Sequence, residues 1–82
     1  MTAPGLSTVQ LDLRGTPCPL NFIRTKLALE NLTPGAALQV DLDAGEPEVM
    51  VTEGLRQAGH AVISLPHPQA PAAVRLRIEP HG

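Results

Sequence analysis

The sequence predicts a two-layer α/β fold of the α+β type, in which two helices cover one face of a mixed four-stranded sheet. Segments in which apolar and polar residues alternate, as in strands, take turns with two segments of helical spacing. The resulting order is β-α-β-α-β-β, and the last two strands can pair as a hairpin. A chain of 82 residues, 43% of them hydrophobic, has room for one such domain with one modest core.

The amino-terminal half contains a strand and a long helix. Val9–Leu13 alternates apolar and polar residues, which is the pattern of a half-buried strand. Residues 1–8 are mostly small or polar, so we expect a flexible leader followed by a single domain over residues 9–80. A helix is expected from Pro19 to about Leu32, because proline is favoured at the first helical position and a Pro-Gly pair follows the segment.

The carboxyl-terminal half contains one helix and three strands. The segments expected to be strands are Ala36–Leu42, His60–Leu65 and Ala73–Glu79, the last of which alternates cleanly between apolar and polar residues. The helix is expected from Glu46 to about Ala58, with acidic residues in its first turn, where the helix dipole favours them. The proline-rich segment 66–71 is expected to be a loop that cannot pair in a sheet.

Composition argues against several functional classes. Phe22 is the only aromatic residue and the formal net charge is −2, so we expect no direct binding of nucleic acid. No apolar run approaches the ~18 residues of a membrane span, and no signal peptide is apparent, so we expect no membrane partner and a cytoplasmic location. The scattered His60, His67 and His81 lack the spacing of a zinc site, and there is no phosphate-binding motif, so neither metal nor cofactor is expected.

Cys18 is the single cysteine, and its sequence neighbours favour a reactive thiol. We expect it at the N-cap of the first helix, where unpaired backbone N–H groups and the helix dipole stabilise a thiolate. The prolines on both sides are typical of a surface turn. Nearby cations that would support the thiolate are Arg14, Arg24 and Lys26. The alternative is a buried cysteine that fills space as a small apolar residue.

A lone thiolate suits transfer chemistry. It can attack a sulfane sulfur, become a persulfide and later release the outer sulfur. Such a protein is a carrier more than a stand-alone enzyme, because nothing in the sequence makes a general base, a cofactor site or a closed substrate pocket. The alternative is a non-catalytic interaction or regulatory module on the same fold, in which Cys18 is incidental.

The segment around Cys18 resembles the signature of the TusA-like (SirA-like) sulfur-carrier proteins. The matching residues are Leu11-Asp12, Arg14-Gly15, Cys18-Pro19, Lys26 and Leu29, and the helix-ending Leu32-Thr33-Pro34-Gly35 is also similar. The resemblance covers Val9 to Glu79.

This resemblance implies that Cys18 accepts persulfide sulfur from a cysteine desulfurase or rhodanese-like donor and passes it to a downstream acceptor protein. Such relays feed tRNA thiolation, molybdenum-cofactor enzymes or sulfur oxidation. Arg14 and Lys26, at matching positions, would support the site electrostatically or in docking.

Asn21 departs from this signature, which has a second proline at the same position. If Cys18 is the N-cap, Asn21 is N3, whose backbone N–H can bond to the N-cap side chain. Asparagine restores the N–H that proline lacks and adds a side-chain amide. We hypothesise that Asn21 compensates for the lost rigidity by giving the sulfur an extra hydrogen bond. The alternative is a divergent subfamily with altered partners or weakened transfer.

Two apolar stripes are expected along the first helix. The stripe expected to face the sheet contains Phe22, Leu29 and Leu32, with Thr25 between them. The stripe expected to point partly outward beside Cys18 contains Leu20, Ile23 and Leu27. Together with Arg24, the outward stripe would form a docking surface for sulfur donors and acceptors. The alternative is that the helix is simply buried more broadly.

Overall fold

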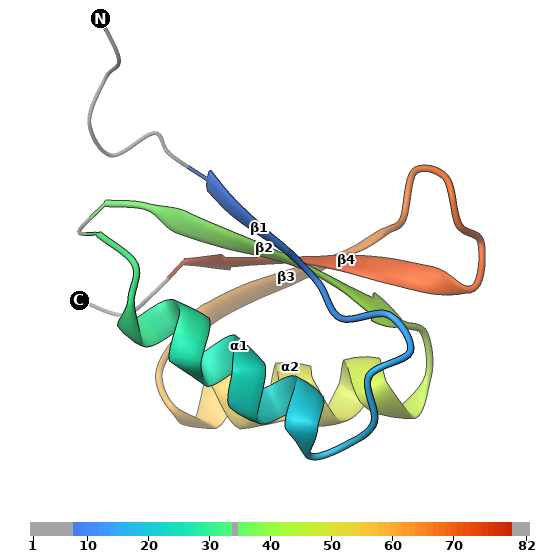
Figure 1. The fold of residues 1–82 in the computed structure, drawn as a ribbon, viewed down its shortest axis with the longest axis horizontal. Helices are drawn as coiled ribbons and strands as arrows, with labels where there is room; N and C mark the ends of the chain where they lie inside the picture. Colours follow the sequence, from blue (N-terminus) through green and yellow to red (C-terminus); the bar gives the residue numbers. More distant parts are fainter. Residues whose placement is uncertain (1–7, 34, 80–82) are drawn as a thin grey trace, which may run out of the picture.

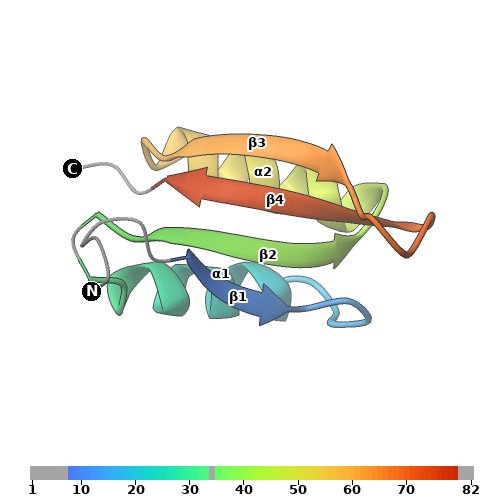
Figure 2. The ribbon, with the colours of Figure 1, turned by 90° about the horizontal axis from the view of Figure 1, so that it is seen from above.

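The computed structural model describes residues 8–33 and 35–79 and confirms the predicted two-layer architecture (Figure 1). The elements are β1 (Thr8–Asp12), α1 (Leu20–Glu30), β2 (Ala37–Asp43), α2 (Glu46–Gln57), β3 (Ala61–Pro66) and β4 (Ala73–Glu79). Both helices lie on the same face of the sheet and leave the other face uncovered (Figure 2). Neither helix is long and apolar enough to cross a membrane.

The strands are ordered β1-β2-β4-β3 across the sheet. β1 and β2 are parallel, as expected for strands joined through a helix, whereas β4 is antiparallel to both β2 and β3. β3 and β4 therefore form the predicted hairpin, and β4 lies between β2 and β3. This arrangement makes the sheet mixed, with β1 and β3 at its edges.

The core lies between the sheet and the helices. In β2, alternate residues are fully buried, whereas Gln39 and Asp41 between them lie on the uncovered face and are only partly buried. The core residues with no exposed surface are Leu38, Val40, Leu42, Val51, Leu55, Leu76 and Ile78. These aliphatic side chains come from β2, α2 and β4, so the central strands and the second helix hold the two layers together.

The bounds of most elements differ by one or two residues from the prediction. α1 begins one residue later and ends two residues earlier than expected, with Pro19 as its N-cap and Asn31 as its C-cap. After the C-cap, the N–H of Leu32 donates to the carbonyl of Leu29 at 3.2 Å, which is a tight turn and no longer α-helix. Most of the expected leader lies outside the described residues, and Thr8 already belongs to β1.

The prediction that Pro66 lies in a loop that cannot pair was wrong. Pro66 is the last residue of β3 and lies opposite Val74 in the hairpin. Proline lacks the N–H of other residues, but β3 is an edge strand, where a missing donor is tolerated. The hairpin loop therefore begins after this residue, and His67 still donates its N–H to the carbonyl of Ala73 at 3.3 Å.

The two stripes of α1 face as predicted. Thr25 and Leu29 are buried, and Phe22 packs partly buried against the core. The outward stripe is well exposed, with relative accessibilities of 46% for Leu20, 48% for Ile23 and 53% for Leu27. The alternative of a more broadly buried helix is therefore wrong.

Candidate functional site

Cys18 lies in the turn between β1 and α1, and its side chain is exposed. The N-cap of α1 is Pro19, so Cys18 lies one residue before the predicted position. The cause is a turn that precedes the regular helix, in which the N–H of Asn21 donates to the carbonyl of Pro17 at 3.1 Å. The Cys18–Pro19 peptide bond is cis. The alternative of a buried structural cysteine is wrong.

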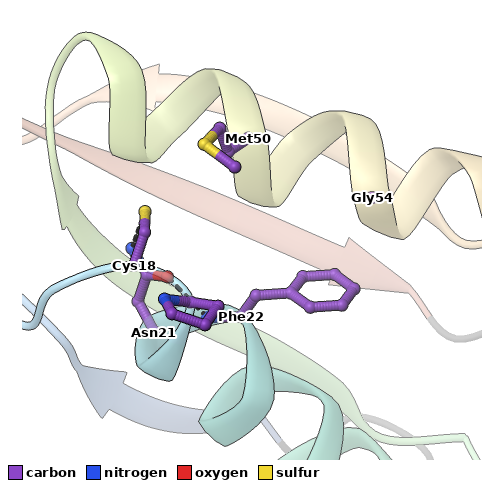
Figure 3. Close-up of a pocket in the computed structure, with 6 residues that line it drawn as sticks. Cys18, Asn21, Phe22, Met50 and Gly54 are labelled. Atoms are coloured by element: carbon purple, nitrogen blue, oxygen red, sulfur yellow. Dashed lines mark hydrogen bonds between the residues drawn. The ribbon is translucent and has the colours of Figure 1, made fainter.

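The sulfur receives a hydrogen bond from the side chain of Asn21. Its Nδ2 lies 3.3 Å from the Sγ of Cys18 (Figure 3). The backbone N–H that the sequence suggested as a donor is instead used in the turn to Pro17. The hypothesised extra hydrogen bond is thus present, but it comes from the side-chain amide.

Asn21 is held firmly at this position. It is fully buried, with no exposed surface. Its Oδ1 accepts the backbone N–H of Phe22 at 2.7 Å, and its carbonyl accepts the hydroxyl of Thr25 at 2.8 Å. The pattern of the sequence did not predict this burial, because a polar residue in the first turn of a helix is usually exposed.

A cavity of about 220 Å³ opens beside the sulfur, between α1 and α2. It is lined by Cys18, Pro19, Asn21, Phe22, Met50 and Gly54. Figure 3 shows the sulfur of Cys18 pointing towards α2, where Met50 projects from the helix. Apart from the amide of Asn21 the lining is apolar, so the sulfur lies at the mouth of a largely apolar hollow.

Gly54 allows the two helices to approach closely at this cavity. A Cβ atom at this position would lie 2.6 Å from Cε1 of Phe22, which is too short for a van der Waals contact. The same ring is within reach of a cation, since Nζ of Lys26 lies over it at 5.9 Å from the centroid. Met50 and Gly54 were not predicted from the sequence; the only available signal was a glycine inside a helical pattern, which commonly has a packing reason.

Arg14, expected to support the thiolate, is engaged elsewhere. Its guanidinium donates two hydrogen bonds to the carboxylate of Asp12, at 2.9 and 2.8 Å. This hydrogen-bonded pair holds the pKa of Asp12 well below its usual value and raises that of Arg14. The following residue, Gly15, donates its N–H to Asp43 at 2.8 Å. Arg14 thus stabilises the turn after β1 through its bonds to Asp12, and these bonds direct its guanidinium to that carboxylate.

Of the other residues considered from the sequence, Arg24 and His67 do not lie together at one site. Arg24 is exposed on α1 together with the outward stripe. His67 lies on the other side of the sheet, where its Nε2 is 3.3 Å from Asp41, and His81 lies outside the described residues. Within residues 8–33 and 35–79, no three His, Cys, Asp or Glu side chains are arranged to hold a metal ion.

A family model described as Sulfurtransferase TusA matches residues 9–79 of this chain. The chain belongs to the TusA family. Its match to a relative from Thermotoga maritima, described as "Putative sulfur carrier protein", is 36% identical over 58 residues and covers 71% of this chain and 73% of the relative. A relative from Archaeoglobus fulgidus with the same description is 46% identical over 56 residues, which span 67% of this chain and 62% of the relative.

A solved structure shows the same fold. The SirA-like protein from Desulfitobacterium hafniense superimposes with a TM-score of 0.73, at 21% identity, over 85% of this chain and 93% of the other. This chain and that SirA-like protein therefore share the four-stranded mixed sheet with two helices on one face.

Proposed function

We propose that this TusA-family chain is a sulfur carrier that accepts sulfane sulfur as a persulfide on Cys18 and relays it to a partner protein. The observation that carries the proposal is the placement of the Cys18 sulfur, exposed at the mouth of an apolar cavity and bonded to one amide donor. The cavity, at about 220 Å³, leaves room beside Sγ for an outer sulfur atom. Membership of the family supports the same chemistry.

The relay consists of two exchanges of one thiolate for another. The thiolate of Cys18 attacks the outer sulfur of a donor persulfide, a new S–S bond forms at Sγ, and the donor leaves as a thiolate with the electron pair of the broken bond. The thiolate of an acceptor then attacks the outer sulfur, and the electron pair of the Cys18 S–S bond returns to Sγ. No net oxidation or reduction occurs, so the chemistry calls for no redox cofactor.

The outward stripe of α1 is the proposed docking surface for the protein donor and acceptor. Leu20, Ile23 and Leu27 are about half exposed, and Arg24 lies among them. Across the cavity, α2 adds the exposed Met50. A partner that covers these apolar side chains would shield the persulfide from water during transfer.

The donors that fit this chemistry are a cysteine desulfurase or a rhodanese-like protein. Lys26, held over the Phe22 ring, is the cation that we propose supports the site or its partners, and Pro19 shapes the turn that presents the sulfur. The expected destinations are tRNA thiolation, cofactor biosynthesis or sulfur metabolism, in the cytoplasm.

Incubation with a cysteine desulfurase and cysteine, followed by intact-mass measurement, tests the proposal. We expect the wild-type chain to gain one sulfur atom and the Cys18→Ala variant to gain none. Because Cys18 is the only cysteine, an adduct on a thiol of this chain has a single possible location. Absence of an adduct on the wild-type chain, or an equal adduct on the variant, would favour the alternative of an interaction or regulatory module.

A further inference from the structure

We propose that Asn21 promotes the release of sulfur from Cys18, by stabilising the thiolate left behind more than the persulfide that precedes it. The inference rests on the proposed function, since it concerns the bond between Sγ and the outer sulfur. It assigns Asn21 a role in setting the direction of transfer, in addition to its place in the turn.

The amide of Asn21 can present only its donor side to the sulfur. Its Oδ1 is occupied by the N–H of Phe22 at 2.7 Å, which determines which end of the amide faces Cys18. The nitrogen at the other end therefore lies against Sγ, at 3.3 Å. Asn21 has no exposed surface, so water does not compete with the sulfur for the side-chain N–H of this residue.

The strength of this hydrogen bond depends on the charge of Sγ. In an ionised persulfide the negative charge is mainly on the outer sulfur, and Sγ is a weak acceptor. When an acceptor thiolate takes the outer sulfur, the electron pair of the S–S bond moves to Sγ, which becomes an anion. Hydrogen bonds to ionised acceptors are stronger than neutral ones, so the amide of Asn21 stabilises the released state more than the loaded state.

The departure from the family signature supports this role. The signature has proline at the position of Asn21, and proline carries no side-chain donor. In this chain the same position supplies a buried N–H to the sulfur. We therefore expect this chain to hold sulfur less tightly than a variant that carries proline or alanine at the position.

The test is the loading equilibrium with a small-molecule couple, which needs no partner protein. The chain is equilibrated with glutathione persulfide and glutathione above the usual thiol pKa of about 8.5, so that changes in protonation do not enter the comparison. The loaded fraction is measured by intact mass after alkylation. We expect Asn21→Ala to raise the equilibrium constant for loading by about tenfold, given the usual strength of a hydrogen bond to a charged group.

Two further variants separate this effect from a change in folding. Asn21→Asp keeps an oxygen acceptor for the N–H of Phe22 but removes the donor to Sγ, so its loading constant should also rise. Asn31→Ala removes an asparagine whose amide bonds to the carbonyl of Leu27 at 2.9 Å near the end of the same helix, and its loading constant should not change. Circular dichroism establishes which variants are folded.

The outcomes distinguish the two proposals. If the wild-type chain loads and both folded Asn21 variants load with an unchanged or lower equilibrium constant, the role of Asn21 is overturned and the carrier function stands. If the wild-type chain takes up no sulfur from either the persulfide or the desulfurase, the carrier function itself is overturned.

Discussion

The surface around Cys18 and the uncovered face of the sheet differ in the kinds of side chain that they expose to solvent. Around Cys18, the outward stripe of α1 exposes aliphatic side chains to solvent. On the uncovered sheet face, polar groups pair with each other: Asp41 accepts two hydrogen bonds from Arg75, at 2.9 and 3.2 Å, and lies 3.3 Å from Nε2 of His67. The outward stripe is mainly aliphatic, whereas the uncovered sheet face combines an exposed apolar residue, Ile63, with charged groups that pair with each other.

Arg14 shows that a cation close to Cys18 in the sequence need not lie at the sulfur. Arg14, four residues before the cysteine, is bonded to Asp12, whose backbone lies opposite Asp41 in the sheet. The environment that the structure builds at the sulfur is instead an apolar cavity with one buried amide. Arg14 thus stabilises the turn beside the sheet, and the sulfur itself lies against apolar side chains and one amide.

The largest expected effect comes from placing a charge on each surface in turn. Ile23 near Cys18 and Ile63 on the uncovered sheet face have similar exposures, 48% and 54%, so Ile23→Glu and Ile63→Glu form a matched pair. We expect Ile23→Glu to slow sulfur transfer from a desulfurase by about 30-fold or more, the factor typical of a central interface residue. Ile63→Glu should leave that rate unchanged, as measured by intact mass over time.

Loading from glutathione persulfide is the control for both isoleucine variants. A small molecule needs no docking surface, so the two variants should load as the wild-type chain does. Equal slowing by Ile23→Glu and Ile63→Glu with the desulfurase would show that the two surfaces do not differ in recognition. Global unfolding of Ile23→Glu would show that this side chain serves the core.

A smaller effect is expected in the packing that forms the cavity. Gly54→Ala should lower the free energy of unfolding by about 1–2 kcal/mol, because the new methyl group overlaps the ring of Phe22. In a Phe22→Ala background the overlap is absent, and Gly54→Ala should stabilise the chain by up to about 1 kcal/mol through its higher helix propensity. Urea unfolding of the wild type, of each single variant and of the double variant measures the coupling energy between Gly54 and Phe22. A Gly54→Ala variant as stable as the wild type would mean that the ring moves aside freely.

The smallest effect is expected on the uncovered sheet face. Asp41→Asn weakens the pair with Arg75 and should lower the free energy of unfolding at neutral pH by about 1 kcal/mol. The hydrogen bonds from Arg75, and secondarily the neighbouring His67, hold the pKa of Asp41 below its usual value. A lowered folded-state pKa contributes stability above the ordinary carboxyl range, and this contribution is lost as the pH falls through the folded-state pKa.

The difference in stability between wild type and Asp41→Asn should therefore be complete at neutral pH and shrink below about pH 4. Urea unfolding at several pH values measures it. Asp12→Asn is the control, because its pair with Arg14 is exposed and should contribute less. A difference that grows on acidification would contradict the assigned pairing.

The sequence alone determined the elements, their order and the two stripes of α1, because hydrophobic spacing and the positions of proline and glycine act over a few residues. It also indicated the exposed turn at Cys18 and an extra hydrogen bond from Asn21. These features depend on near neighbours in the chain, and the structure contains them with shifts of one or two residues.

Only the tertiary structure decided how distant parts meet. The order of the strands, the burial of Asn21 and the approach of α2 to Cys18 through Met50 and Gly54 all depend on packing between segments about 30 residues apart in sequence or more. Pro66 owes its place in an edge strand to the β3–β4 hairpin, in which it lies opposite Val74. Local spacing can predict which side of a helix is apolar, but the neighbour that lies against it follows from how the two layers fit together.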